Sequence, residues 1–388
     1  MPQHPPKKIL ILSVSAGAGH LRAAQAIEAY AGHDGADGTG PLATARHIDV
    51  MDFVTPAFRK LYTDFYIKLV NKAPALWGYL YHATHDAPKD SSMQRVRRAI
   101  ERLNTRALMA QIAAFAPDAI VCTHFLPAEL LSRALRDHQL DCPVWVQVTD
   151  FDLHRMWVLD HMQGYFAATD EVAFRMRHEG IAFERIHVTG IPIMPAFAQA
   201  PKRMQCAQAF GLDPQRKTIL LMGGGAGLGS LDTIAAGLLL LEGDFQLIVL
   251  AGKNAAALAK LTALAAQYPG RLLAQGFTSE VERLMACADL VITKPGGLTT
   301  SECLALGLPM IVNSPIPGQE ERNADFLLEQ GVALKALDGA SLEYRVRHLL
   351  DHPEQLQAMR ERALALGRPR AALEVLAKVL ATVPQAQA

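Results

Sequence analysis

The chain has 388 residues, with 38 Lys and Arg against 38 Asp and Glu, and 50% of its residues are hydrophobic. This length predicts two domains, because a domain takes roughly 100–200 residues, and the balanced charge without a basic or acidic tail excludes a dedicated nucleic-acid binder. The five cysteines form no CxxC pair, which excludes a disulfide scaffold and a cysteine zinc site and fits the reducing cytoplasm.

Short apolar runs alternate with helix-length segments along the whole chain. A first series of predicted strands covers residues 9–14, 47–51, 119–123, 144–149, 165–168 and 187–189. A second series follows the proline-rich stretch 191–214 and covers residues 218–222, 246–251, 272–275, 290–293, 310–313 and 333–335. Continuous apolar strands separated by helices indicate parallel sheets that are covered on both faces.

This alternation predicts an α/β fold with two Rossmann-like, doubly wound domains. We expect an N-terminal domain in residues 1–195, a second domain in residues 196–355, and in residues 356–388 a helix that packs back toward the first domain. Ligands of open α/β sheets bind beyond the carboxyl ends of the strands, so two facing sheets would place a site in the cleft between them. No apolar run approaches the roughly 20 residues that a membrane-spanning helix needs.

The first glycine cluster follows the first predicted strand and reads Ser15-Ala16-Gly17-Ala18-Gly19-His20. Glycines at a strand-to-helix turn let a ligand approach the backbone, and the N-terminus of the helix favours negative charge. A dinucleotide fingerprint would need a third glycine where Arg22 stands, which disfavours an NAD site. His20 either projects from this turn into the cleft or satisfies local hydrogen bonds at the start of the helix.

Two further clusters lie in the second half of the chain. The loop 223–229 holds five glycines in seven residues directly after a strand, and their N–H groups can surround a phosphate, although no Walker Gly-Lys-Ser/Thr follows. Residues 293–302, Thr-Lys-Pro-Gly-Gly-Leu-Thr-Thr-Ser-Glu, again place glycines and hydroxyls at a helix start. There Glu302 can bind two ribose hydroxyls, or it can form a capping box with Thr299.

The segment 55–106 combines basic and aromatic residues. It holds 10 Lys and Arg against 4 Asp and Glu, and eight of the 25 aromatic residues lie between residues 53 and 81. Such a mixture suits an anionic bilayer surface, whereas the apolar spacing from residue 58 to residue 69 is that of an ordinary core-facing helix. We expect this segment to bind the inner face of the cytoplasmic membrane as a peripheral contact.

Together these motifs resemble the family 28 glycosyltransferases that comprise monogalactosyldiacylglycerol synthases and bacterial processive diacylglycerol glucosyltransferases. The peptidoglycan N-acetylglucosaminyltransferase is a more distant relative. The resemblance rests on residues 14–20, 148–157 (Val-Thr-Asp-Phe-Asp-Leu-His-Arg-Met-Trp), 189–193 (Thr-Gly-Ile-Pro-Ile), 223–229, 293–302 and 317–323, which occur in the right order. It implies the GT-B fold, a donor such as UDP-glucose or UDP-galactose, and inversion at the anomeric carbon.

The resemblance also implies roles for individual residues, with His20 as the catalytic base. The implied donor-binding residues are Gly224, Gly225, Ala226, Gly227, Phe277, Thr278, Lys294, Gly296, Gly297, Thr299, Glu302, Gln319, Glu320 and Asn323. In the family, the glycine loop holds the diphosphate, the glutamate binds ribose, the backbone at Phe277 holds uracil, and Gln319 and Glu320 contact the sugar. The residues implied on the acceptor side are Gly17, Gly19, Asp150, His154 and Trp157.

Asp150-Phe151-Asp152 has the DxD form of a metal site for a sugar diphosphate. The family pattern requires only the first aspartate, and the phosphate loops lie in the second domain. We therefore expect neither a metal ion nor another cofactor.

The implied activity moves a hexose from a UDP-sugar to a lipid hydroxyl, most simply that of diacylglycerol. A histidine can remove the hydroxyl proton, while backbone N–H groups stabilise the departing diphosphate. Three alternatives stay open: transfer to another acceptor, as in the peptidoglycan enzyme; a UDP-sugar epimerase, which needs no acceptor alcohol; and a non-catalytic protein that binds nucleotide sugars or lipids.

Overall fold

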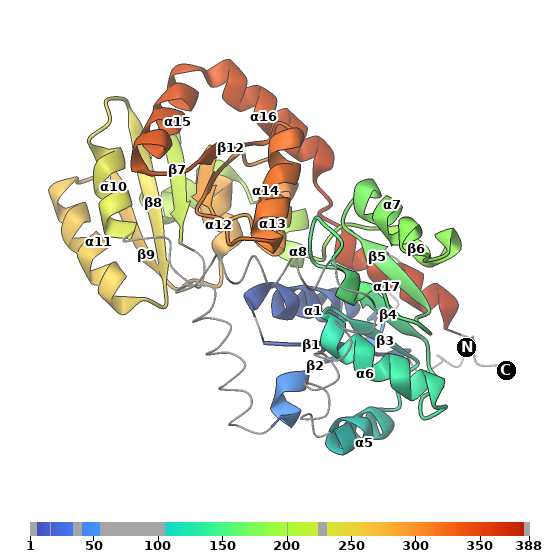
Figure 1. Cartoon of the computed structure of the whole chain (residues 1–388). Coiled ribbons are helices and arrows are strands. Elements are labelled where there is room, and N and C mark those ends of the chain that lie inside the picture. The colour runs from blue at the N-terminus through green and yellow to red at the C-terminus, as the bar shows by residue number, and fades with distance from the viewer. Residues whose placement is uncertain are drawn as a thin grey trace. The chain divides into compact units, whose positions relative to one another are not determined.

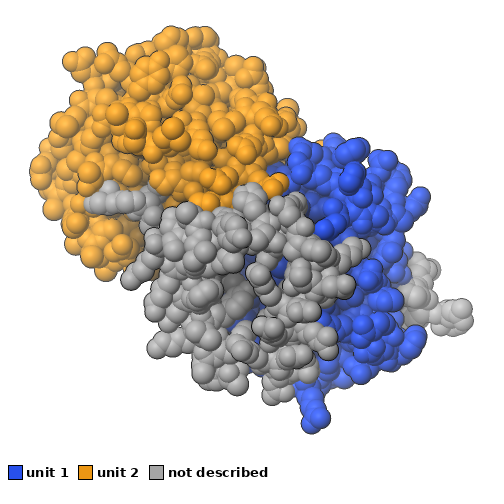
Figure 2. All heavy atoms as spheres, in the orientation of Figure 1, with its two compact units in different colours: residues 1–195, 370–388 blue, residues 196–369 orange. Residues whose placement is uncertain are grey.

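A computed structural model describes residues 6–15, 17–33, 41–54, 105–199, 201–223 and 231–383. The chain divides into two compact units, one formed by residues 1–195 and 370–388 and the other by residues 196–369 (Figure 2). The segment 55–106, which we predict to contact a membrane, lies outside the described residues except for its last two. Among the helices that are described, none has the length and apolar character needed to cross a bilayer.

The first unit contains a parallel six-stranded sheet in the order β2-β1-β3-β4-β5-β6 (Figure 1). All six strands predicted for this half of the chain are present, with slightly different ends. Their bounds are β1 Lys8–Ser13, β2 Thr44–Asp49, β3 Ala119–Cys122, β4 Val144–Gln147, β5 Gly164–Ala167 and β6 Ile186–Val188. The helices are α1 Ala18–Ala31, α5 Thr105–Phe115, α6 Phe125–Arg136, α7 Asp170–His178 and α17 Ala371–Thr382, with short 3-10 helices at Val50–Phe53, Arg155–Trp157 and Phe183–Arg185.

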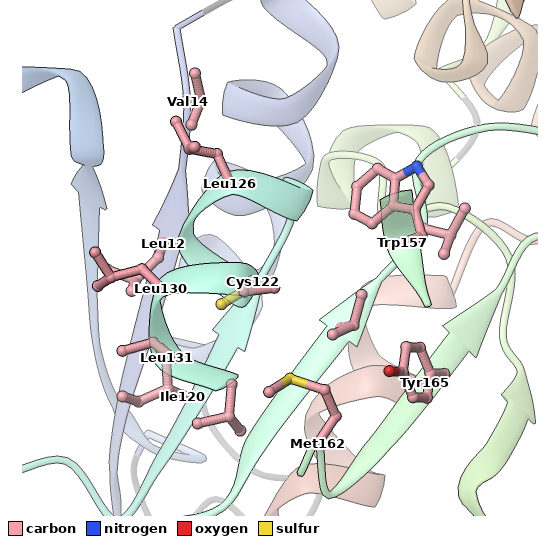
Figure 3. Packing of buried hydrophobic residues seen from close by; sticks show 14 of the residues in the cluster. Leu12, Val14, Ile120, Cys122, Leu126, Leu130, Leu131, Trp157, Met162 and Tyr165 are labelled. Carbon is pink, nitrogen blue, oxygen red and sulfur yellow. The ribbon is translucent and has the colours of Figure 1, made fainter. Parts of the chain in front are cut away.

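Strand residues of this sheet alternate between two apolar cores, because successive side chains point to opposite faces. Leu12, Ile120 and Cys122 are buried on one face, beneath the leucines of α6 (Figure 3). Ile11 and Val121 are buried on the other face, together with apolar residues of α1 and α17. Helices thus cover both faces of the sheet, as the continuous apolar strands predict.

The second unit repeats this plan with the parallel order β12-β11-β10-β7-β8-β9. The predicted strands are again all present, as β7 Lys217–Met222, β8 Phe245–Gly252, β9 Leu272–Gly276, β10 Leu290–Thr293, β11 Met310–Asn313 and β12 Ala333–Ala336. The helices are α9 Arg203–Ala209, α10 Leu231–Leu239, α11 Ala255–Gln267, α12 Val281–Cys287, α13 Gly297–Ala305, α14 Gln319–Glu329, α15 Gly339–Asp351 and α16 Pro353–Leu366; α8 Pro195–Ala198 starts at the unit boundary.

The C-terminal boundary differs from the expected division at residue 355. Leu356 and Met359 of α16 are buried in the core of the second unit, and a Cβ at Gly367 would lie 2.6 Å from the Leu304 carbonyl oxygen of α13. The second unit therefore continues to Pro369. Only α17 lies in the first unit, where it packs against α1.

Each sheet has a topological switch point beside its first strand. β1 lies between β2 and β3, and β7 lies between β8 and β10, so the chain extends each sheet first on one side of this strand and then on the other. Open α/β sheets bind ligands at such points, beyond the carboxyl ends of the strands. In the first unit this point carries the residues that follow β1 and β3, and in the second unit those that follow β7 and β10.

Candidate active site

His20 lies in the first turn of α1, directly after the β1–α1 turn. The turn passes through Gly17, whose φ of 120° is a conformation that L side chains rarely adopt. Gly19 lies beside His20 in the first helical turn. The glycines of this cluster therefore bring the His20 side chain to the carboxyl end of the sheet.

The His20 ring is held by oxygen atoms from the segments that follow two neighbouring strands. Its Nδ1 lies 2.9 Å from the Thr123 carbonyl oxygen, after β3, and 2.9 Å from the Thr149 hydroxyl oxygen, after β4. A carbonyl oxygen can only accept a hydrogen bond, so Nδ1 carries the proton and Nε2 of the neutral ring has the lone pair. This is the tautomer that a general base acting through Nε2 requires.

Thr123 also fixes the backbone of His20. Its hydroxyl donates to the His20 carbonyl oxygen at 3.0 Å, while its own carbonyl accepts the ring N–H. One residue therefore restrains both the helix start and the ring at the β1/β3 switch point.

The surroundings of His20 keep its ring neutral. Burial lowers the pKa of His20 to about 4, although the hydrogen bond to Thr123 opposes this effect. His124 lies edge-to-face with the ring at 4.6 Å between centroids, and burial followed by the proximity of His20 lowers the pKa of His124 as well. The Leu126 N–H donates to His124 Nδ1 at 3.0 Å, so the proton of this second imidazole is on Nε2.

Three further residues predicted for the acceptor side, Asp150, His154 and Trp157, lie at separate positions after β4. Asp150 directly follows Thr149 and is 8% exposed, and Trp157 lies 6.2 Å from the His20 ring. His154 caps the 3-10 helix Arg155–Trp157, because its Nδ1 accepts the Met156 N–H at 3.2 Å. The buried His154 therefore has a structural partner within its own turn.

The DxD segment makes an ion pair rather than an open carboxylate pair. Asp152 is 6% exposed, and its Oδ1 lies 3.3 Å from Nη1 of Arg175 on α7. Within the described part of the chain, no group of three or more His, Cys, Asp or Glu residues is arranged to hold a metal ion.

In the second unit, the predicted donor residues of the β10 loop lie around the start of α13. Gly296 is the N-cap, and Gly297 and Thr299 belong to the first helical turn. Glu302 is the sixth residue of the helix and is 5% exposed. A capping box needs its acidic residue three positions after the N-cap, so this position excludes the capping interpretation of Glu302.

The start of α14 is joined to the β10 loop by a buried amide. Asn323 is fully buried, and its Nδ2 donates to the Pro295 carbonyl oxygen at 3.0 Å. Glu320 accepts the Ile316 N–H at 2.7 Å, and burial raises its pKa against the opposing charge of Lys294. The charge of Lys294 therefore acts on Glu320 in the first turn of α14, where Gln319 is the first residue.

The remaining predicted donor residues follow β9 and β7. Phe277 is 66% exposed, with the Lys253 ammonium 5.2 Å from its ring centroid. The Thr278 hydroxyl oxygen accepts the Glu280 N–H at 3.0 Å. The predicted diphosphate residues Gly224, Gly225, Ala226 and Gly227 lie outside the described residues.

Sequence reasoning missed three residues that contact His20, namely Thr123, His124 and Thr149. Both threonines end predicted strands, and Thr149 also belongs to the motif 148–157, but the sequence analysis assigns neither of them a role. The available signal was their position, because residues that follow neighbouring parallel strands meet at one edge of the sheet.

Two family models match the chain. Monogalactosyldiacylglycerol (MGDG) synthase matches residues 20–193, and the glycosyltransferase family 28 C-terminal domain matches residues 218–375. The processive diacylglycerol beta-glucosyltransferase of Bacillus pumilus is 28% identical over 377 residues, which cover 96% of this chain and 94% of that protein. The enzyme of the same name from Bacillus licheniformis is 31% identical over 265 residues, which cover 68% of each chain.

Solved structures with low sequence identity share the fold. UDP-GlcNAc 2-epimerase from Neisseria meningitidis has a TM-score of 0.60 at 16% identity, covering 97% of this chain and 99% of that chain. MurG from Acinetobacter baumannii has a TM-score of 0.59 at 16% identity, covering 97% and 100%.

These likenesses and the two doubly wound units define the class of the protein as GT-B, which confirms the predicted fold. The family models and the curated relatives narrow this class further. The chain belongs to the family of monogalactosyldiacylglycerol synthases and processive diacylglycerol glucosyltransferases, within glycosyltransferase family 28. It is an enzyme of glycolipid biosynthesis, a UDP-sugar-dependent hexosyltransferase, as the sequence motifs predict.

Proposed function

We propose that this enzyme transfers a hexose from a UDP-hexose to the hydroxyl of diacylglycerol, with inversion at the anomeric carbon. We propose UDP-glucose as the donor rather than UDP-galactose, because the curated relatives are named glucosyltransferases. The observation that carries the proposal is the neutral His20 ring, which has its proton on Nδ1 and its lone pair on Nε2 at the β1/β3 switch point.

His20 acts as the general base in the proposed reaction. Nε2 accepts the acceptor's hydroxyl proton while the hydroxyl oxygen forms a bond to the anomeric carbon. The bond between that carbon and the diphosphate oxygen breaks, and UDP leaves with the electron pair. The Nδ1 proton stays in place, and the imidazolium returns the other proton to water after transfer.

The donor is held by the second unit in this proposal. The N-terminus of α13 presents backbone N–H groups to the diphosphate, where they stabilise the growing charge, and the glycine-rich residues 224–227 bind the same group, as their sequence predicts. Glu302 binds the ribose, the backbone at Phe277 and Thr278 holds uracil, and Lys294 and Glu320 face the sugar and its phosphate. The hydrogen bond from the Asn323 amide of α14 to the Pro295 carbonyl oxygen supports this assignment, because it joins the loop before α13 to the helix that carries Gln319 and Glu320.

We propose that the reaction needs no metal ion. The oriented N–H groups supply the charge stabilisation that a divalent ion supplies in other sugar transferases. The ion pair between Asp152 and Arg175 supports this proposal, because it occupies the carboxylate that a DxD site would need.

We propose that the enzyme reaches its lipid at the inner face of the membrane through the segment 55–106. Its excess of Lys and Arg among aromatic residues supports binding to anionic lipid. Replacing Trp77, Arg95, Arg97 and Arg98 with alanine should reduce co-sedimentation with anionic liposomes. Unchanged co-sedimentation would assign membrane contact to another part of the chain.

The decisive experiment supplies labelled UDP-glucose or UDP-galactose together with diacylglycerol in mixed micelles. We expect a labelled glycolipid and an equal amount of UDP, and the better donor identifies the sugar. His20→Gln should lower kcat by about 10²–10⁴, whereas His33→Gln, at an exposed position just after α1, should leave it unchanged. Absence of labelled lipid with both donors would reject the proposed function.

A further inference from the structure

The Nδ1 atom of His20 has two oxygen partners but only one proton. The Thr123 carbonyl oxygen and the Thr149 hydroxyl oxygen both lie 2.9 Å from it. The two oxygens come from the segments that follow the neighbouring strands β3 and β4. The ring N–H is therefore shared between two acceptors, one of which is a side chain that mutation can remove.

Thr149 lies at the carboxyl end of the sheet, two residues after β4, where its hydroxyl has little conformational freedom. Its side chain is 5% exposed, and the preceding residue, Val148, is fully buried and donates its N–H to the Phe166 carbonyl oxygen at 3.1 Å. Threonine is branched at Cβ, which restricts χ1. A fixed hydroxyl oxygen is a suitable second anchor for an imidazole ring.

A second anchor changes what the ring can do. With the Thr123 carbonyl alone, the ring could swing about a single hydrogen bond and move Nε2 away from the acceptor hydroxyl. With two acceptors that follow different strands, the direction of the Nδ1–H bond and hence that of Nε2 are both restrained. Misplacement by about 1 Å can reduce the rate about 10²-fold, so this restraint affects the chemical step.

We propose that Thr149 is a positioning residue for the general base: its hydroxyl accepts the Nδ1–H of His20 together with the Thr123 carbonyl, and the two oxygens fix the tautomer and the orientation of the ring, which in a Ser-His-Asp triad is one of the tasks of the carboxylate. The inference rests on the proposed role of His20. It assigns to Thr149 a function that neither the motifs nor the family resemblance indicate.

The groups around the ring are consistent with orientation by uncharged oxygens. The titratable group that faces His20 is His124, at 4.6 Å between ring centroids, and Trp157 at 6.2 Å is uncharged. No carboxylate among the described residues makes a hydrogen bond or an ion pair with His20. The hydroxyl of Thr149 is thus the side-chain group that accepts the ring N–H.

Thr149→Val and Thr149→Ser test the proposal with the full-length enzyme. Valine keeps the branched shape without the hydroxyl, and we expect kcat to fall about tenfold with KM for the UDP-sugar changed less than about twofold. Serine keeps the hydroxyl, and we expect kcat to stay within about threefold of the wild-type value. Thr189→Val is the matched control, because this buried threonine directly follows β6 and its hydroxyl donates to the Gly190 carbonyl oxygen at 3.2 Å.

A wild-type kcat in Thr149→Val, or an equal loss in the valine and serine variants, would overturn the positioning role. The nearly unchanged KM for the UDP-sugar provides a second readout, because a general loss of structure around Thr149 would not be confined to kcat.

NMR of enzyme labelled with ¹⁵N-histidine separates this proposal from the proposed function, because it needs no substrate. His20→Gln identifies the His20 signals. We expect the proton on Nδ1 in the wild type and faster exchange of that proton with water in Thr149→Val. A proton on Nε2, or identical exchange in both proteins, would refute the inference, whereas absence of transfer by the wild type with the expected NMR result would refute only the proposed function.

Discussion

The acid limb of the pH–rate profile should lie near pH 4 instead of near the usual histidine value of 6.5. Burial lowers the pKa of His20 to about 4, and a general base loses activity only when it becomes protonated. At pH 5.5 a histidine of ordinary pKa would be about 90% protonated, whereas His20 would be about 3% protonated. The two cases differ about tenfold in kcat/KM at this pH.

The assay measures initial rates of hexose transfer at low UDP-sugar concentration between pH 4.5 and 8, at constant ionic strength. Under these conditions kcat/KM reports groups of the enzyme without bound substrate, which is the state that the structure describes. Circular dichroism at each pH identifies any loss of folded enzyme, and the residual rate of His20→Gln is subtracted. We expect nearly constant kcat/KM down to pH 5.

A limb near pH 6.5 would refute the reasoning. It would mean that water solvates the imidazolium of the substrate-free enzyme about as well as it does in a peptide. The burial of the ring beside His124 and Trp157 would then be incomplete in solution, and part of the base would be protonated and inactive near physiological pH.

Further predictions concern stability and binding. His20 has a pKa of about 4 in the folded enzyme and near 6.5 in the unfolded chain, so the unfolded chain binds more protons between these two values. The free energy of unfolding is therefore unaffected by this group above pH 6.5 and falls as the pH is lowered toward 4. The urea midpoint should consequently fall less with acid in His20→Gln than in the wild type. Glu302→Gln should weaken UDP binding at least about tenfold by calorimetry. Leu376→Ala, at a fully buried position of α17, should cost about 2–5 kcal/mol of unfolding free energy in urea titrations, against less than about 0.5 for exposed Lys378→Ala. EDTA should leave the transfer rate unchanged.

The strands could be predicted from the sequence because parallel strands between two helical layers are apolar on both sides. Runs such as residues 9–12 are fully buried, and their composition alone marks them as core strands. The strand ends were less accurate. Thr123 and Thr149 were placed inside strands, yet β3 ends at Cys122 and β4 at Gln147.

The C-terminal division could not be predicted in the same way. Both α16 and α17 carry an apolar face, and a helical pattern does not say which core it enters. Leu356 packs into the second unit and Leu376 into the first, a difference set by the shape of the two cores. Gly367 marks the change, because no side chain fits between its backbone and that of Leu304.

The candidate base was identified from local sequence, whereas its partners were not. His20 follows a glycine-rich turn that is visible in six consecutive residues. Thr123 and Thr149 are 103 and 129 positions away, and only the strand order β1-β3-β4 brings them to the ring. Hydrogen bonds between distant loops depend on topology, which single-sequence patterns specify poorly.

Orientation by neutral oxygens has a consequence for the proposed reaction. A carboxylate on Nδ1 would raise the pKa of the ring, whereas the threonine oxygens fix the tautomer and leave burial to keep the pKa low. So weak a base cannot deprotonate a free alcohol, and it takes the proton only once the oxygen has begun to bond to the anomeric carbon and has become acidic. Departure of the diphosphate must then be well advanced, and its stabilisation supplies most of the lowering of the barrier. Variants that remove N–H donors around α13 should therefore reduce kcat more than Thr149→Val does.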